Sequence, residues 1–438
     1  MTAVAAQFTD PYRDRFAAFL AQRHDPDVFI QRRRAAFAGF EQLGLPTRQQ
    51  EAWRLTDLSA PQAIAWHAPS AAPVDAGTLP TLDMPTQRLV FVNGRFAPAL
   101  SRLGDLPGQT LVASLGQALR THPERIEPWL DQVPGLDQHP FAALNGAFWE
   151  DGAFIHLPRG TTLDTPIHLV FHASGGDMHL QPRLLLVLED GAQASVVVEY
   201  RGTDRYLDTP LAEIELGAGA TLHYHQVQEE APQAVHLGSL RLRQQRDSTA
   251  HLHLLGFGGQ LARCDLETVL DDTGAHCTLN GLIMGRDRQF SAVHVRINHA
   301  QPQGSSEQLF KSVLDGQARA VFDGLIHVSQ HAQKTDARQL SRNLLLSRQA
   351  QAQANPRLEI LADDVKCSHG SSTGFLDPDA EFYLRARGIP AAEARMLLIH
   401  AFANDSLDRI QLVPLRERLA GVLAERLALD TLTGDRPA

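Results

Sequence analysis

Hydrophobic and polar residues alternate with a period of two through most of the middle of the chain. Between about residues 150 and 365, short runs such as IHLVFHA (167–173), ASVVVEY (194–200) and ARAVFDGLIHV (318–328) follow one another. Turn signals such as EDGA, GAGA and DDTGA separate these runs, and helical windows are almost absent between them. This pattern predicts an all-β body and argues against a doubly wound α/β sheet.

A weak repeat runs through the same region. Gly191, Gly219, Gly274 and Gly316 each stand at a turn before a strand, and gaps of 28, 55 and 42 residues separate them. These gaps lie within one residue of multiples of 14, as the stacked coils of a solenoid would give. Four positions are few, so this repeat alone leaves a sandwich or a double-stranded barrel open.

Both ends of the chain carry the 3.6-residue periodicity of helices. The chain therefore divides into an N-terminal mainly helical domain (1–145), a β core (146–374) and a C-terminal helical domain (375–438). An amphipathic helix in the last domain more often packs against its own domain than against a partner. Its apolar face is formed by Leu415, Leu419, Val422, Leu423 and Leu427.

Composition and charge exclude several classes of protein. The net charge of −10 and the pI near 6.0 argue against a broad nucleic-acid-binding surface. No segment approaches the roughly 18–20 apolar residues that span a bilayer, and the N-terminus lacks the pattern of an export signal. Three cysteines are too few for a disulfide framework. These features predict a cytoplasmic protein with reduced thiols and without membrane or nucleic-acid partners.

Two further absences concern chemistry. The sequence has no G-x-x-x-x-G-K-[ST] motif, so any nucleotide hydrolysis would have to be carried out by another chain. It also has no cysteine cluster that could hold an iron–sulfur centre alone. Cys264 and Cys277 lie in predicted strands, where we expect them to be buried as small apolar residues.

One candidate metal site lies in a histidine-rich strand. The stretch GAGATLHYHQVQE (217–229) is similar to the first metal-binding motif of cupins. Its residues His223, His225 and Glu229 could bind one divalent metal ion, as in a cupin-like metal-dependent enzyme. The second cupin motif is matched only in part, by His276 and Asn280.

A second candidate site lies in ADDVKCSHGSSTG (362–374). Cys367 and His369 share one face of a strand, because side chains alternate with a period of two. They could bind metal, act as a nucleophile with its base, or belong to the wall of the fold. A catalytic pair also needs a third group that orients the base, and the sequence identifies none. Asp363 and Asp364 are interpreted as turn or capping residues.

Longer motifs resemble a known family. Residues 309–347 and 355–402 are similar to the SufB/SufD family of iron–sulfur cluster assembly proteins, and GLPTRQQEAWRLTDL (44–58) resembles the opening motif of the SufD type. The Cys-Ser-His-Gly sequence that begins at Cys367 is the SufD form. Ser341 stands roughly where members of the SufB type carry a cluster-building cysteine.

The resemblance implies a fold and a role. The expected fold is a right-handed parallel β-helix flanked by N- and C-terminal helical domains. The expected role is that of a non-catalytic scaffold subunit in a SufBC2D-type complex, which supports iron acquisition and de novo cluster assembly. The implied partners are a SufB paralogue in a heterodimer, the ABC-type ATPase SufC, which the C-terminal helices would contact, and indirectly a cysteine desulfurase system. The sequence leaves open a homodimer when the chain is alone.

The resemblance also implies the site residues and the bound groups. It assigns His369 first, and Cys367 second, as transient iron or cluster ligands shared with SufB. The iron–sulfur cluster would be a transient group at the interface between SufB and SufD. The resemblance allows a reduced FAD in the complex, and we expect no tightly bound group on the isolated chain.

Overall fold

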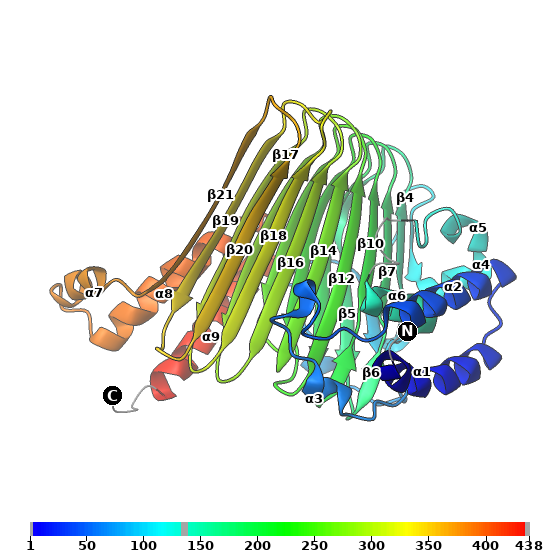
Figure 1. Cartoon of the computed structure of the whole chain (residues 1–438), viewed down its shortest axis with the longest axis horizontal. Coiled ribbons are helices and arrows are strands. Elements are labelled where there is room, and N and C mark those ends of the chain that lie inside the picture. The colour runs from blue at the N-terminus through cyan, green and yellow to red at the C-terminus, as the bar shows by residue number, and fades with distance from the viewer. Residues whose placement is uncertain (1–2, 133–138, 434–438) are drawn as a thin grey trace.

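The structure is a computed structural model that describes residues 3–132 and 139–433. It is mainly β, with two long sheets stacked coil upon coil into a parallel β-solenoid and helices at both ends (Figure 1). This architecture confirms the predicted β-helix with flanking helices. The sandwich and the barrel, which the glycine repeat had left open, are excluded.

The regular elements have the following bounds. The helices are α1 (Ala3–Ala21), α2 (Asp27–Leu43), α3 (Ser59–Gln62), α4 (Leu115–Thr121), α5 (Pro123–Ile126), α6 (Pro140–Phe148), α7 (Pro378–Arg385), α8 (Ala391–Leu407) and α9 (Val413–Thr433). The strands are β1 (Gln87–Val92), β2 (Arg95–Phe96), β3 (Leu111–Ser114), β4 (Gly152–Leu157), β5 (Thr162–Ala173), β6 (Met178–Leu180), β7 (Arg183–Leu188), β8 (Gln193–Gly202), β9 (Tyr206–Asp208), β10 (Leu211–Leu216), β11 (Thr221–Glu229), β12 (Val235–Gln244), β13 (Thr249–Gly256), β14 (Leu261–Leu270), β15 (His276–Gly285), β16 (Phe290–His299), β17 (Ser305–Leu314), β18 (Arg319–Val328), β19 (Asp336–Leu345), β20 (Gln351–Ile360) and β21 (Lys366–Phe375).

Successive coils add one strand to each sheet. Sheet 1 has the order β2-β1-β5-β8-β11-β13-β15-β17-β19-β21. Sheet 2 has the order β20-β18-β16-β14-β12-β10-β7-β4-β3, and β6 and β9 join it beside β12. Ala250 in β13 pairs with Leu222 on one side and with Cys277 on the other, so one coil takes 27 or 28 residues at this point. The pairs β1–β2 and β3–β4 are antiparallel, and every other named pair is parallel.

The glycine repeat has a backbone cause. Gly191, Gly219 and Gly274 stand where the chain passes from sheet 2 to sheet 1, and their φ angles of 69°, 66° and 76° lie in the left-handed region that favours glycine. Gly316, with φ 62°, stands at the opposite edge, where the chain passes from sheet 1 to sheet 2. Asp247, with φ 55°, takes the turn from sheet 2 to sheet 1 that lies between those of Gly219 and Gly274. Because this turn has no glycine, the repeat is weak in the sequence.

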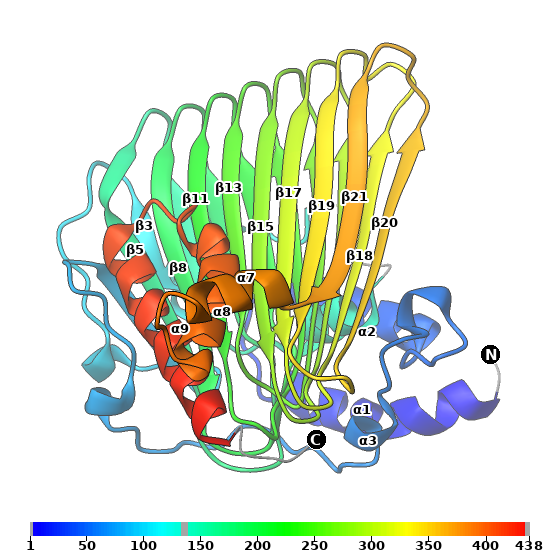
Figure 2. The same cartoon turned by 90° about the vertical axis from the view of Figure 1, so that its left-hand side faces the viewer.

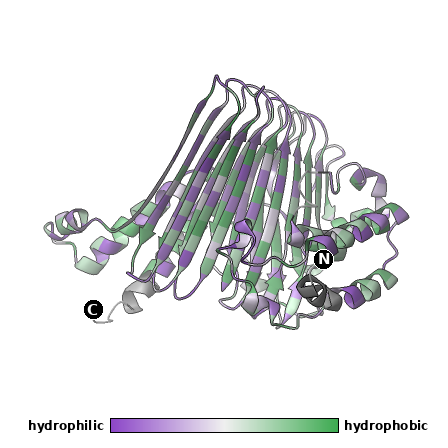
Figure 3. Ribbon diagram, in the orientation of Figure 1, coloured by the Kyte–Doolittle hydropathy of each residue, from purple (hydrophilic) through white to green (hydrophobic). Residues whose placement is uncertain are grey.

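The main core fills the space between the two sheets. Tyr224, Leu252 and Leu279 form one column of this interior, on the neighbouring strands β11, β13 and β15. Burying each large apolar side chain contributes about 1.5–3 kcal/mol. Figure 3 shows the alternation of hydrophobic and hydrophilic residues along the strands. Strand β7 departs from this alternation and is buried at every position, because helices also cover its outer face.

Helices cover the outer faces of both sheets. The N-terminal helices α1, α2 and α6 contribute Phe16, Phe37 and Phe148 to a cluster against sheet 2. The C-terminal helices α8 and α9 lie across sheet 1 (Figure 2), where Leu415 and Leu419 are fully buried. The amphipathic C-terminal helix therefore packs against its own chain, on the β core. In the described part of the chain, no helix is long and apolar enough to cross a bilayer.

Candidate functional site at the open end of the solenoid

The last coil leaves two strand edges open. Among the described strands, β21 pairs only with β19, and β20 pairs only with β18. The exposed backbone edge of such a strand can pair with a strand of another chain. Large apolar side chains are exposed beside this end: Leu361 follows β20 and is 54% exposed, and Phe375 closes β21 and is 60% exposed.

Cys367 lies on the inner side of β21. It pairs with the buried Ala337 of β19 and packs against the small apolar cluster around Ile326 and Val328. Burial raises the pKa of the Cys367 thiol, and the nearby Asp336 carboxylate raises it further. The thiol is therefore protonated at neutral pH in the isolated chain, and a metal ion would have to displace its proton.

His369 continues a column of inward-facing side chains. Below it in the column, Gln339 of β19 and Gln308 of β17 follow, and the next two members are Leu279 and Leu252. The Gln339 amide donates a hydrogen bond of 3.0 Å to Gln308 Oε1. Because no coil covers β21, the His369 side chain is exposed although it points along the interior.

On the side of sheet 1, the interior becomes polar towards this end. Ser312 donates a hydrogen bond of 2.6 Å to Asn343, whose amide donates one of 3.2 Å to Thr373 on β21. Ser341 is fully buried on β19 beside Ser371, and its hydroxyl has no hydrogen-bond partner. The open end is thus polar along sheet 1, and small apolar clusters around Val328 and Leu314 lie beside this polar part.

The structure brings the two predicted ligands together on one strand. Cys367 and His369 alternate with the outward residue Ser368, so thiol and imidazole face the same side of the exposed edge. Sulfur and imidazole ligands suit iron. Asp364 lies in the bend before β21, where its backbone N–H donates a hydrogen bond of 2.8 Å to Gln333. Cys277 is fully buried as predicted, and Cys264 is partly buried against the same core.

The cupin-like residues do not form one site. His223 and His225 lie on the outer face of β11, where they stack on His251 and His253 with ring centroids 4.8 Å and 5.0 Å apart. Glu229 lies at the end of the strand and binds the Arg201 guanidinium at 2.7 Å instead. The neighbours of these histidines are therefore the histidines of the next coil, not the carboxylate that the motif had suggested.

This row of histidines predicts sensitivity to acid. Burial, aided by positive charge at the neighbouring His251 and His223, lowers the pKa of His253 from 6.5 to about 4. Between pH 4 and pH 6.5 the unfolded chain binds more protons at this residue than the folded chain does. The contribution of the neutral His253 to the free energy of unfolding is therefore complete above pH 6.5 and is lost as the pH falls towards 4. Between pH 7 and pH 5 we expect a loss of about 2 kcal/mol in the free energy of unfolding.

Urea unfolding at both pH values measures this effect. The variant His253→Gln should lose less stability than the parent chain on acidification, and His331→Gln, at an exposed position, is the matched control. Equal losses for His253→Gln and the parent chain would contradict the assignment.

Comparison with known proteins identifies the family. Residues 171–402 match the model of the SUF system FeS cluster assembly SufBD core domain, and residues 2–169 match that of the SufBD protein N-terminal region. The chain belongs to the SufBD family. An iron–sulfur cluster assembly SufBD family protein of Synechocystis sp. is 34% identical over 410 residues, which cover 90% of each chain. The protein SufD of Escherichia coli is 30% identical over 392 residues, covering 88% of this chain and 90% of its own length.

Membership in the SufBD family removes the competing interpretation. The fold is a solenoid instead of a cupin barrel, and the family is one of iron–sulfur cluster assembly. The hypothesis of a cupin-like enzyme using His223, His225 and Glu229 is therefore wrong. In a region with so many histidines, the spacing matched the motif by chance.

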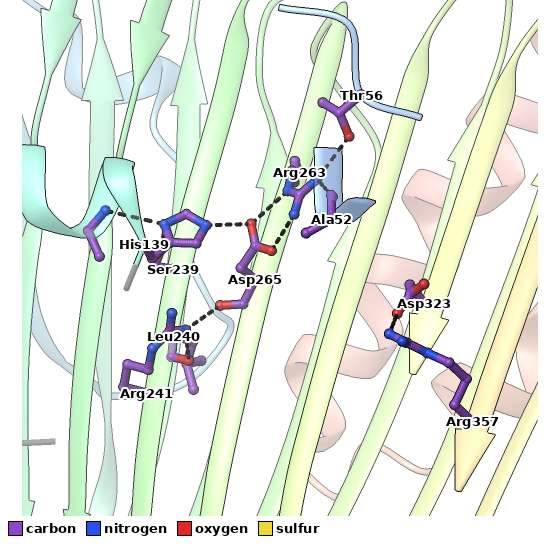
Figure 4. Close-up of polar contacts among 11 residues, drawn as sticks. Ala52, Thr56, His139, Ser239, Leu240, Arg241, Arg263, Asp265, Asp323 and Arg357 are labelled. Atoms are coloured by element: carbon purple, nitrogen blue, oxygen red, sulfur yellow. Dashed lines mark hydrogen bonds and ion pairs between the residues drawn. The ribbon is translucent and has the colours of Figure 1, made fainter. Parts of the chain in front are cut away.

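The N-terminal motif of this SufBD chain has a structural role. Its segment 44–58 docks on the outer face of sheet 2, where the Arg263 guanidinium lies 3.6 Å from the centre of the Trp53 ring. Arg263 donates hydrogen bonds to the Ala52 carbonyl at 2.7 Å and to the Thr56 hydroxyl at 3.0 Å, as Figure 4 shows. Asp265 accepts two further hydrogen bonds of 2.7 Å from the same guanidinium. One buried arginine thus holds the motif on the solenoid.

Sequence reasoning missed two groups of polar residues inside the solenoid. One is the pair Gln308 and Gln339 beneath His369. The other is a buried set of ionisable residues, Asp208, Glu230 and His236. The length of one coil is the signal that could have indicated such contacts. Asp208 and His236 are 28 residues apart, one coil length, and pair directly across β9 and β12.

Proposed function

We propose that this chain is the SufD-type, non-catalytic subunit of a SUF scaffold complex and that its open end binds a SufB-type partner. The observation that carries this proposal is the unpaired edge of β21, which presents Cys367 and His369 at a polar opening of the solenoid. A SufB-type chain would pair along this edge and supply further ligands. The nascent iron–sulfur cluster is then cargo shared between two chains.

The two open strands differ in how well they suit such pairing. Strand β20 contains Pro356 and carries the Arg357 guanidinium bound to Asp323 at 2.6 Å, both of which hinder the addition of a strand. Strand β21 has no proline, and Lys366 is its single charged residue. We infer that β21 is the pairing strand. A site with only one thiol and one imidazole from this side holds a cluster loosely, as transfer to an acceptor requires.

The other functions of the complex fall to partner chains. Ser341 takes the place of a cluster-building cysteine, and its buried hydroxyl cannot replace a thiolate. Sulfur would therefore enter on the SufB side, from a cysteine desulfurase system. ATP hydrolysis would come from SufC, since the sequence holds no P-loop motif. The cytoplasmic location and a reduced flavin in the assembled complex stay predictions.

The proposed contact with the ATPase lies on α7. In the motif EFYLRARG, Phe382 is 70% exposed and Tyr383 is 55% exposed, and Leu397 on α8 is also exposed. Exposed apolar side chains that gather on one short helix are typical of a protein interface. The rest of the C-terminal domain is part of the core, because Ile399 and Leu407 of α8 pack on sheet 1.

Substitution on α7 tests this contact more cleanly than deletion, because loss of residues after 376 would also expose the face of sheet 1. We expect Phe382→Asp with Tyr383→Ser to abolish co-purification with a SufC-type ATPase without lowering the thermal stability of the chain. Leu103→Asp, at an exposed leucine of the N-terminal region, is the matched control and should co-purify normally. Normal co-purification of the α7 variant would refute the contact.

Co-expression tests the proposal as a whole. The chain, a SufB-type protein and a SufC-type ATPase should be isolated as one complex.

The backbone N–H groups of β21 point alternately to β19 and to the open edge. The Lys366 N–H donates a hydrogen bond of 2.8 Å to the Thr335 carbonyl on the β19 side, so the Ser371 N–H faces the open edge.

Removal of that edge donor tests the pairing itself. We expect Ser371→Pro to separate the SufB-type chain but to leave the ATPase bound, because proline has no backbone N–H to donate to an added strand. Ser371→Ala keeps the N–H and is the matched control, which should yield the intact complex. A complex that forms equally well with Ser371→Pro would show that the partner does not pair with β21.

A further inference from the structure

A second set of metal-competent side chains lies buried within the solenoid. Asp208 ends β9, Glu230 follows β11 directly, and His236 lies on β12 beside Asp208. Their exposed fractions are 3%, 6% and 2%. The chain passes here from sheet 1 to sheet 2, and strands β13, β15, β17 and β19 separate β11 from β21 within sheet 1. The set is therefore independent of Cys367 and His369.

The ligand atoms of this set converge. One ligating atom of each residue lies within 4.8 Å of those of the other two. His236 Nδ1 is 2.9 Å from Glu230 Oε2 and 3.8 Å from Asp208 Oδ2. In the part of the chain that the structure describes, this is the one group of three such residues with converging ligand atoms.

The cluster is not satisfied by the protein around it. The Gln228 amide donates a hydrogen bond of 2.8 Å to Glu230 Oε2. However, Asp208 Oδ1, Glu230 Oε1 and His236 Nε2 are buried without a hydrogen-bond partner among the residues that the structure describes. A buried polar atom without a partner destabilises the fold by about 1–3 kcal/mol, so two unpartnered carboxylate oxygens in one cluster call for a ligand.

The charges point to a cation. Two carboxyl groups are buried here, and their ion-pair partner among the described residues is His236, with no arginine or lysine. Buried carboxylates are stable only when a positive charge or a proton compensates them. A divalent cation held between the two carboxylates and the imidazole would compensate both carboxylates at once.

Space for further ligands adjoins the cluster. A cavity of about 40 Å³ is lined by His236, Gln228 and Cys264, among other residues. A cavity of this size has room for a water molecule. Of the three proposed ligands, His236 lines this cavity, so a water molecule could approach the cluster from the imidazole side.

We propose that Asp208, Glu230 and His236 bind one divalent first-row transition metal ion as a structural site inside the solenoid. Two carboxylates and one imidazole are ligands that Zn²⁺, Fe²⁺ and Mn²⁺ accept. The ion would connect β9, the end of β11 and β12, and so would fix two neighbouring coils at the edge where they turn. This proposal departs from the expectation that the isolated chain holds no tightly bound group. Gln228 is a positioning residue, because it orients Glu230 through the hydrogen bond of 2.8 Å.

The test uses the full-length chain with Cys367→Ala and His369→Ala, which removes the proposed cluster ligands. This parent chain is stripped with a chelator and titrated with Zn²⁺ and, without oxygen, with Fe²⁺. Calorimetry and metal analysis after gel filtration should show about one ion per chain, and thermal unfolding should shift to higher temperature on metal addition. If the parent chain binds no metal and gains no stability, protons alone compensate the charges of Asp208 and Glu230, and the proposal is overturned.

Substitutions then locate the site. Asp208→Asn and Glu230→Gln preserve shape and should abolish binding, and Gln228→Ala should weaken it by about 10–100-fold. Gln228→Ala decides the question if the ligand variants fail to fold, because it leaves all three ligands in place. Glu215→Gln, at a buried carboxylate that binds Arg243 outside the cluster, and His253→Gln, in the outer row of histidines, should retain full binding. Binding that survives Glu230→Gln and Gln228→Ala unchanged would refute the assignment.

Discussion

Replacing His369 with alanine is expected to reduce the iron and sulfide content of the assembled complex to background. The imidazole is the ligand that the open edge presents most freely, since it is exposed and no coil covers it. The complex should keep its normal stoichiometry and melting temperature, because an exposed side chain contributes within about 0.5 kcal/mol to the free energy of unfolding. Reconstitution with iron and sulfide, followed by chemical analysis of both, measures the effect.

Two matched variants make this result specific. Cys367→Ala should be milder, because His369 and the ligands of the SufB-type partner would remain. Ser368→Ala changes the residue between them, which points to the other face of β21, and should leave assembly unchanged. Normal assembly in His369→Ala would show that the site is assigned to the wrong residue. Loss of the partner chain in that variant would indicate a role in the interface instead of in cluster binding.

The largest effect on stability is expected from Asp265→Ala. Asp265 accepts two hydrogen bonds from the buried Arg263 and lies 3.0 Å from His139 Nε2. Burial raises the pKa of Asp265, but the Arg263 charge and the hydrogen bonds with Arg263 and His139 outweigh it and hold that pKa well below its usual range. Removing the carboxylate leaves a guanidinium buried without its counter-charge, at a cost of about 3–5 kcal/mol in the free energy of unfolding. Chemical denaturation measures this loss.

Figure 4 also contains the control for this prediction. Asp323 binds Arg357 at 2.6 Å on the same sheet, but that arginine is 46% exposed in its side chain. Asp323→Ala should therefore lower the free energy of unfolding by about 1 kcal/mol or less. Asp265→Ala should also make segment 44–58 more sensitive to proteolysis, because Arg263 anchors it. Equal losses in the two variants would mean that burial of the Arg263 pair has no energetic consequence.

The candidate site shows how far local sequence could lead. The spacing of Cys367 and His369 placed both on one face of a strand, and the pairing with β19 confirms this. The helical periodicity after residue 374 predicted that the strands end there, but only the tertiary structure shows that no other described segment covers the face of β21. The error over His223, His225 and Glu229 has the same origin, because a strand motif does not reveal which side chains lie next to it in neighbouring coils.

The sequence by itself determined that the middle of the chain is β and that both ends carry helices. Period-two patterning, left-handed turns at Gly191 and Gly219, and helical periodicity at both ends are local properties, set by backbone sterics and by the burial of alternate side chains. Contacts between residues one coil apart were decided only by the tertiary structure. Asp208 meets His236, Gln308 meets Gln339, and Arg263 meets Trp53 because the coils stack in register and the N-terminal segment folds back onto them. Coil lengths vary along the solenoid, so the register follows from the summed packing of all coils and not from any one stretch of sequence.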